Sequence, residues 1–220
     1  MGVRGWAIAC VVLGLVGWWF SPLSPRLPEA PKITGTGGTI ASAAACPPPP
    51  QVARGMVPLQ SAVPHDFPVA AVEDARLTAL AGFSVDARVL SRRDYTLGRE
   101  ATYSPTDLVL GWGRMRDDAV LDRLDIGQHG RWYSYRWSSD GAPIPPGEIA
   151  RSSANMHIVP ADAAAAAALR RLRAGQRVRI DGWLVRLDAP DGWTWRSSLT
   201  RDDTGAGACE LIYACSIRGE

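Results

Sequence analysis

The sequence has few cysteines and histidines and almost no lysine. Its 220 residues include four cysteines, three histidines and a single lysine, Lys32. The histidines lie far apart and no CxxC or HExxH spacing occurs, so we predict no metal site. The phosphate-binding motifs GxGxxG and the Walker loop are missing, as is the GxSxG motif of serine hydrolases. We therefore expect no cofactor.

The four cysteines are too few for a disulfide-stabilised scaffold. Cys10 lies in an apolar N-terminal segment, Cys46 in a proline-rich segment, and Cys209 and Cys215 near the C-terminus. If residues 209–215 form one strand, the Cα atoms of its two cysteines lie roughly 20 Å apart, beyond disulfide reach. Three cysteines remain outside the apolar segment, so at least one of them is free or pairs between chains.

Charge of one sign is not in excess either. The 24 basic and 22 acidic residues give a formal net charge of +2. This balance gives no bulk electrostatic reason for binding nucleic acid or acidic lipid. The preference for arginine over lysine, together with much alanine and proline, is typical of a GC-rich genome rather than of a function.

The most informative feature that is present is the apolar N-terminal segment. Residues 5–20 carry no charged side chain and have indoles at both ends, from Trp6 and from Trp18 and Trp19. Indoles in these positions are typical of a helix whose ends lie at the two membrane interfaces. The helix spans roughly 24 Å, and modest bilayer thinning can make up the difference from a ~30 Å hydrocarbon core. We predict a transmembrane anchor over residues 1–23.

A cleaved signal peptide is the alternative for this segment. Each small residue soon after it, namely Ser21, Ser24 and Ala30, is followed by proline, which constrains the backbone where a peptidase cuts. We therefore expect an uncleaved signal-anchor that crosses the inner membrane once. The usual orientation of such an anchor places the remaining chain in the periplasm.

The remaining chain divides by composition into two parts. Residues 24–68 are rich in proline, alanine and glycine, and include four consecutive prolines from Pro47 to Pro50. This composition buries too little apolar surface to order the chain and favours extended polyproline II. We predict a disordered spacer there and one globular domain over residues 69–220.

The patterns within residues 69–220 predict an α+β domain of about six short strands and two or three helices. The expected strands are residues 81–90, 131–137, 148–159, 176–187, 193–200 and 208–217. The expected helices begin at Ser104, where proline follows an N-cap serine, at Asp117 and at Asp162. Because the last helix precedes a hairpin and a closing strand, we expect a small, mostly antiparallel β-barrel or sheet that is OB-like.

One candidate catalytic site combines Cys209 with His157. Asn155 and His157 share one face of the expected strand 148–159, and a glycine-rich bend over residues 205–207 precedes Cys209. With Asn155 orienting the imidazole, these are the residue types of a Cys–His hydrolase or acyltransferase acting on an envelope substrate. The competing interpretation is an ordinary polar strand face and a small buried cysteine.

A candidate binding surface lies on the expected hairpin. Its residues are Trp183, Trp193, Trp195, Arg177 and Arg179. Tryptophan and arginine on an OB-like sheet can stack on sugars or bases and contact phosphates. Asp181 interleaves with the arginines, which is typical of a solvated charge network instead. We expect a non-catalytic binding or scaffold domain with an envelope protein or glycan as partner, and nucleic acid is the partner we expect least.

Three segments stand out as motifs. They are SPTDLVLGWGRM at 104–115, SANMHIVPA at 153–161 and TGAGACE at 204–210. Together they resemble an uncharacterised group of bacterial proteins that have a short N-terminal membrane segment. The resemblance covers residues 83–213, and because that group has no established activity it implies no function.

Overall fold

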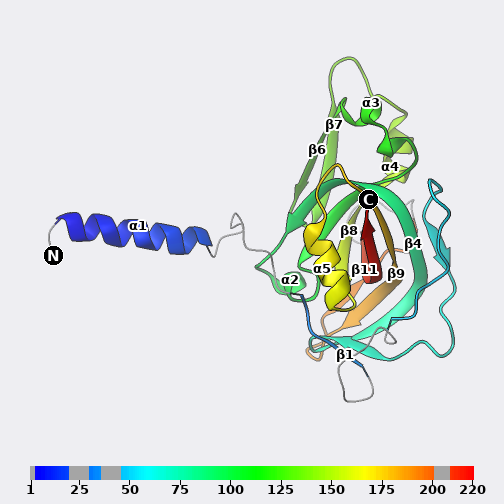
Figure 1. Ribbon diagram of the computed structural model, residues 1–220, viewed down its shortest axis with the longest axis horizontal. Coiled ribbons are helices and arrows are strands. Elements are labelled where there is room, and N and C mark those ends of the chain that lie inside the picture. The colour runs from blue at the N-terminus through cyan, green and yellow to red at the C-terminus, as the bar shows by residue number, and fades with distance from the viewer. Residues whose placement is uncertain (1–2, 20–29, 36–45, 201–208) are drawn as a thin grey trace.

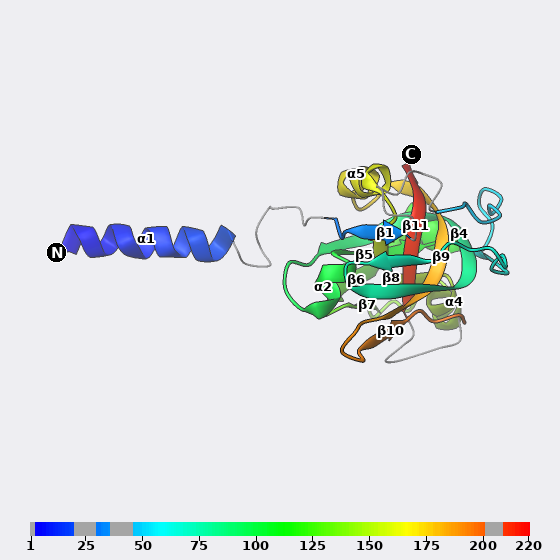
Figure 2. The ribbon, with the colours of Figure 1, turned by 90° about the horizontal axis from the view of Figure 1, so that it is seen from below.

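The computed structural model describes residues 3–19, 30–35, 46–200 and 209–220. Within these residues the chain is an α+β protein with one large mixed sheet, a separate two-stranded hairpin and five α-helices (Figure 1), so the expected fold class is confirmed at this level. Helix α1 (Val3–Trp19) lies apart from the sheet in both views (Figures 1 and 2). None of the helices in the described residues has both the length and the apolar character needed to cross a membrane.

The elements follow one another along the chain as strands with short helices between them. The strands are β1 (Ile33–Gly35), β2 (Leu59–Ser61), β3 (Ala70–Val72), β4 (Ala75–Asp94), β5 (Thr106–Gly111), β6 (Leu124–His129), β7 (Trp132–Trp137), β8 (Ser153–Pro160), β9 (Arg177–Asp188), β10 (Thr194–Arg196) and β11 (Glu210–Gly219). The helices after α1 are α2 (Arg99–Tyr103), the 3-10 helix η2 (Gly113–Arg116), α3 (Asp118–Leu121), α4 (Pro146–Arg151) and α5 (Ala163–Arg171). Four α-helices thus follow α1 in the described part of the chain, more than the two or three expected.

The large sheet is ordered β1-β3-β4-β5-β8-β11-β9-β10, with β2 on β4 and an additional pairing of β4 with β9. Every pair is antiparallel except β8 with β11, which is parallel. The long β4 pairs with β9 along most of its length and with β5 at its C-terminal end. Its register shifts at residues 79–81 and again at 89–91 mark bulges, which bend a strand and let it serve two neighbours.

The main core lies between the inner face of the sheet and α5, which contacts β8 and β11. Helix α5 begins where the sequence predicts, because the Asp162 carboxylate accepts a hydrogen bond from Ala165 N at 2.7 Å. A smaller core of Met115, Val120 and Ile149 lies under the β6–β7 hairpin. Figure 1 shows this hairpin projecting beyond the large sheet, beside α3 and α4.

Two predicted elements are wrong. The segment after Ser104 is strand β5 rather than a helix, and all six of its residues are buried. Residues 108–110 therefore read as an uninterrupted apolar run, which periodicity cannot separate from a buried helix. The expected strand 148–159 instead begins as α4, which has Pro146 in its first turn, and becomes β8 only at Ser153.

Described parts of the expected spacer join the sheet. Strand β1 pairs with β3, and β2 pairs with β4. Residues 46–56, which we call the N-terminal strap, cross the outer side of β4 and β9: Val52 N donates to Ser84 Oγ at 2.9 Å and Gly55 N to the Asp86 carboxylate at 2.6 Å. Side chains of the sheet thus accept hydrogen bonds from backbone N–H groups of the strap, which the proline-rich strap cannot pair within itself. Residues 24–29 and 36–45 of the expected spacer lie outside the described residues.

A disulfide fixes one end of the strap. Cys46 is bonded to Cys215 on β11, which leaves Cys209 and Cys10 as free cysteines. Beside this bond, the indole nitrogen of Trp183 donates to Pro47 O at 2.8 Å. The bond connects positions 169 residues apart, so no local spacing could indicate it.

Candidate functional site

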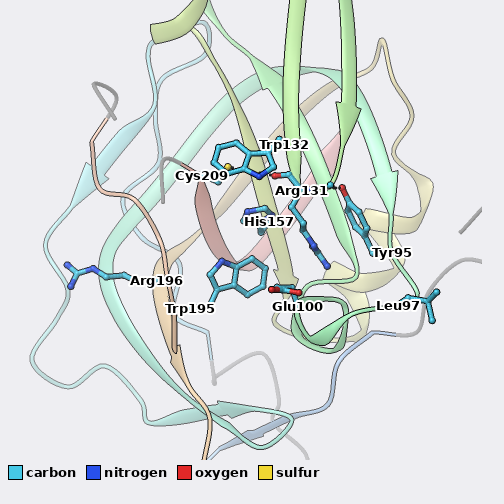
Figure 3. Close-up of a pocket in the computed structure, with 10 residues that line it drawn as sticks. Tyr95, Leu97, Glu100, Arg131, Trp132, His157, Trp195, Arg196 and Cys209 are labelled. Atoms are coloured by element: carbon cyan, nitrogen blue, oxygen red, sulfur yellow. Dashed lines mark hydrogen bonds between the residues drawn. The ribbon is translucent and has the colours of Figure 1, made fainter. Parts of the chain in front are cut away.

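A pocket of about 640 Å³ opens between the end of β4, the turn of the β6–β7 hairpin and β10 (Figure 3). It is lined by Tyr95, Leu97, Glu100, Gly130, Arg131, Trp132, His157, Trp195, Arg196 and Cys209. Three aromatic side chains (Tyr95, Trp132 and Trp195) and five other ionisable ones thus converge from segments far apart in the sequence. Two of the three expected catalytic residues and one expected binding residue are among them.

Asp107 on β5 organises the floor of this site. Its side chain is fully buried, and its Oδ1 accepts hydrogen bonds from His157 Nδ1 at 2.9 Å and from Arg131 Nη1 at 2.7 Å. Asp107 and His157 are directly opposite in the antiparallel β5–β8 pair, which places their side chains on one face. A buried carboxylate is stable only when it is paired in this way.

Arg131 is held in a conformation that few residues other than glycine adopt. It follows Gly130 in the two-residue turn of the β6–β7 hairpin, and their φ angles are +69° and +54°. A turn with two positive φ angles matches the twist of the hairpin but strains a residue that has a side chain. Two contacts with Tyr95 offset this strain: Arg131 N donates to the Tyr95 hydroxyl at 3.1 Å, and the Arg131 guanidinium lies 4.0 Å from the centre of the Tyr95 ring.

Asn155 fastens the hairpin to the sheet. Its Nδ2 donates to Arg131 O at 2.8 Å, and its Oδ1 accepts from Gln128 Nε2 at 2.8 Å. Gln128 in turn accepts from Ser91 Oγ at 2.9 Å. The residue that contacts the imidazole of His157 is therefore Asp107, whose other carboxylate oxygen accepts a hydrogen bond from Asn155 Nδ2 at 3.3 Å.

His157 presents one nitrogen to the pocket. A carboxylate only accepts hydrogen bonds, so the contact with Asp107 places the proton of the neutral ring on Nδ1. Nε2 is then an acceptor. The side chain is 5% exposed, and its ring centre lies 4.8 Å from that of Trp195.

Cys209 lines the same pocket, but its thiol is not activated. Burial of the side chain raises the pKa of Cys209 to about 11, and the neighbouring charge of Glu210 adds to the shift. A hydrogen bond with Asn155 opposes it only in part. At neutral pH the group is therefore a thiol, whereas a nucleophilic cysteine needs a lowered pKa.

We expect Cys209 to react slowly with iodoacetamide. In the full chain carrying Cys10→Ser, alkylation at pH 7 should be at least tenfold slower than that of an unstructured thiol, because the reactive thiolate is rare when the pKa is about 11. The rate should rise steadily up to about pH 11 and should not change in His157→Ala. Rapid labelling at pH 7 that slows in His157→Ala would restore the Cys–His nucleophile.

Trp183, Arg177 and Arg179 do not reach the pocket. Trp183 is 1% exposed and packs edge-on against Phe67, so its expected role on a binding surface is wrong. Arg179 Nη1 donates to Val52 O at 2.8 Å and so holds the strap, while Arg177 is an exposed residue at the start of β9. Burial of Trp183 follows from the strap, which composition alone does not place on the sheet.

Trp193 and Trp195 lie near one another, and only Trp195 lines the pocket. The Trp193 ring stacks on Tyr103 with centres 5.2 Å apart, and the Arg99 guanidinium lies 5.3 Å from its centre. Because Tyr103 is buried, this stack ties the β9–β10 connection to α2 rather than forming a surface.

Sequence reasoning missed Asp107, Arg131, Tyr95 and Glu100. Asp107 lies in the segment after Ser104 that the sequence pattern predicts as a helix, and a helix there would not place it opposite His157. Gly130 before an alternating aromatic strand was a usable signal of the hairpin turn that carries Arg131.

No family model, curated protein or solved structure is found to match the chain. Within the described ranges, no three side chains of histidine, cysteine, aspartate or glutamate gather in a way that could hold a metal ion. The geometry offers an aromatic pocket with a fixed imidazole acceptor, a paired arginine and an unactivated thiol. Such a site is suited to binding.

Proposed function

We propose that this protein is an envelope-facing binding domain whose pocket holds a small polar ligand or the end of a larger one. The observation that carries the proposal is the convergence of Tyr95, Trp132 and Trp195 over the polar pair Asp107–His157. Ligand sites are typically apolar, aromatic concavities with a few placed polar groups. The buried network that fixes the hairpin turn supports a preformed pocket.

We further propose that the sheet is OB-like. In support, β4, β5, β8, β11 and β9 pair in succession and β9 pairs again with β4, while α5 follows β8. OB-like domains bind ligands on their second and third strands and on the loops after the first and fourth. Taken in chain order, the five strands of such a domain correspond to β4, β5, β8, β9 and β11. His157 then lies on the third strand, Tyr95 follows the first strand, and Trp195 follows the fourth.

The proposed location is the periplasmic side of the inner membrane, with the N-terminal segment as an anchor. The Cys46–Cys215 disulfide supports an oxidising compartment, because such bonds are rare in the reducing cytosol. The apolar α1, with exposed Trp6 and Trp18 near its two ends, supports membrane attachment.

The hydrolase and the nucleic-acid module are weaker proposals. The raised pKa of Cys209 disfavours the thiolate nucleophile that the hydrolase requires. For nucleic acid, the Arg131 guanidinium that would contact a phosphate is already paired with Asp107. Binding that weakens steeply with salt would favour the nucleic-acid module.

Fluorine NMR of the full chain in detergent tests whether the pocket binds. The chain has nine tryptophans, which can be labelled as 5-fluorotryptophan and assigned by substitution. A low-molecular-mass extract of bacterial envelopes should shift the resonances of Trp132 and Trp195 in a saturable way. Trp137 is the matched control, because it lies on the same strand as Trp132, is similarly exposed (39% against 41%) and does not line the pocket. Equal shifts at Trp132 and Trp137, or none, would contradict the proposal.

A further inference from the structure

We infer that the pocket takes a neutral saccharide, whose ring stacks on the indoles and whose hydroxyls donate to His157 Nε2 and the Glu100 carboxylate. This inference rests on the proposed binding function and adds the class of ligand. It follows from which hydrogen-bonding groups the pocket leaves available and from the charge around them.

Two of the ionisable groups that line the pocket, His157 and Glu100, offer acceptors. Asp107 fixes the proton of the neutral His157 ring on Nδ1, so Nε2 offers a lone pair. Among the described residues no hydrogen bond or ion pair engages the Glu100 carboxylate, which also lines the pocket. A ligand that satisfies both groups must donate hydrogen bonds.

The strong donors are withdrawn from the pocket. Arg131 Nη1 is used by Asp107 Oδ1 at 2.7 Å and by Ser104 O at 2.8 Å, while Nη2 has no hydrogen-bond partner among the described residues but is shielded from solvent. Figure 3 shows the Arg196 side chain pointing away from the other labelled residues. An anionic ligand would therefore meet the Glu100 charge without a free guanidinium opposite it. This arrangement disfavours acidic sugars and phosphates.

The aromatic side chains that line the pocket favour a sugar ring over a simple amine as the ligand. Trp132 is 41% exposed and Trp195 is half-buried, so the pocket has aromatic side chains that a ligand can cover. The less polar C–H face of a pyranose packs on such a surface, and each indole also carries one N–H donor. A hydroxyl both donates and accepts, so a sugar can satisfy the indoles together with His157 and Glu100. An ammonium group can only donate.

Calorimetry on the full chain in detergent tests the ligand class with three probes. They are chitotetraose as a neutral sugar, trigalacturonate as an acidic sugar and 1,5-diaminopentane as an amine without a ring. We expect chitotetraose to bind at least tenfold more tightly than either of the others. Trp132→Ala should weaken its binding roughly tenfold, as for an aromatic anchor, while Trp137→Ala should leave it unchanged.

A charge substitution gives a second readout. Glu100→Gln keeps an acceptor oxygen but removes the negative charge. Binding of trigalacturonate should therefore strengthen severalfold, whereas binding of chitotetraose should weaken severalfold, because a neutral acceptor forms a weaker hydrogen bond than a carboxylate. The inference is overturned if trigalacturonate or the diamine binds more tightly than chitotetraose, or if no probe binds although the envelope extract shifts Trp132 and Trp195. In either case the binding function stands, whereas an extract without effect removes that function itself.

Discussion

Replacing Asp107 with alanine is expected to lower the free energy of unfolding by about 3–5 kcal/mol, because it leaves the half-buried guanidinium of Arg131 without its partner. The Asp107 side chain is fully buried and also holds His157, so the pocket should lose its fixed imidazole as well. Urea unfolding followed by far-UV circular dichroism measures the stability. The probe sugar chitotetraose, if it binds the wild type, should bind this variant more weakly.

The matched control is Asp125→Ala. Asp125 pairs with Arg136 across the β6–β7 hairpin, but the two side chains are 67% and 81% exposed. An exposed pair contributes little, so the change should stay within about 0.5 kcal/mol. A double variant, Asp107→Ala with Arg131→Ala, should lose less than the sum of the two single variants, because removing both charges leaves neither uncompensated. Strict additivity would mean that the two side chains do not interact.

Apolar/polar alternation in strands and capping residues at helix ends predicted the elements that have one solvent-facing side. Strand β7 follows the alternating aromatic pattern after Arg131, and α5 begins at its Asp162 cap as expected. Strand β5 could not be recognised in this way. It lies between β4 and β8 with all its residues buried, so its sequence has no alternation to detect.

The candidate site was predictable only as separate parts. His157 and Asn155 were predicted because alternate residues share one face of a strand, and Cys209 because it follows a glycine-rich bend. The structure brings the three residues near one another because β11 pairs in parallel with β8. Their chemistry depends on Asp107, which lies on the strand that was mistaken for a helix. Burial, which sets the thiol pKa, is a property of the packed fold and is not visible in local sequence.

The strap shows a different limit of sequence reasoning. Proline-rich composition predicts that residues 46–56 cannot order themselves, and their order indeed depends on groups from elsewhere, such as Ser84 and Asp86. Gly82 shows how closely the strap approaches, because a Cβ there would lie 3.0 Å from Pro49 Cβ. Such long-range docking is set by the surface of the sheet and not by the segment's own composition.

Removing the disulfide is the second change with a large expected effect. The Cys46–Cys215 bond closes a loop between positions 169 residues apart, and such a long loop restricts the unfolded chain strongly. We expect Cys46→Ala with Cys215→Ala to lower the free energy of unfolding by about 4–5 kcal/mol. Dithiothreitol should have the same effect on the wild type, and urea midpoints with and without the reductant measure it.

Cys209→Ala is the control for the loss of a cysteine as such. It removes a small, partly buried thiol that forms no disulfide, so the expected loss is below about 1.5 kcal/mol and independent of reductant. The fluorescence of Trp183 should change only when the disulfide is opened, because the strap beside that bond accepts its indole hydrogen bond. Equal urea midpoints for oxidised and reduced protein would show that the strap is held by its hydrogen bonds alone. A pair of cysteines found reduced in cells would remove the main support for a periplasmic domain, since the bond is the described feature that most directly indicates an oxidising compartment.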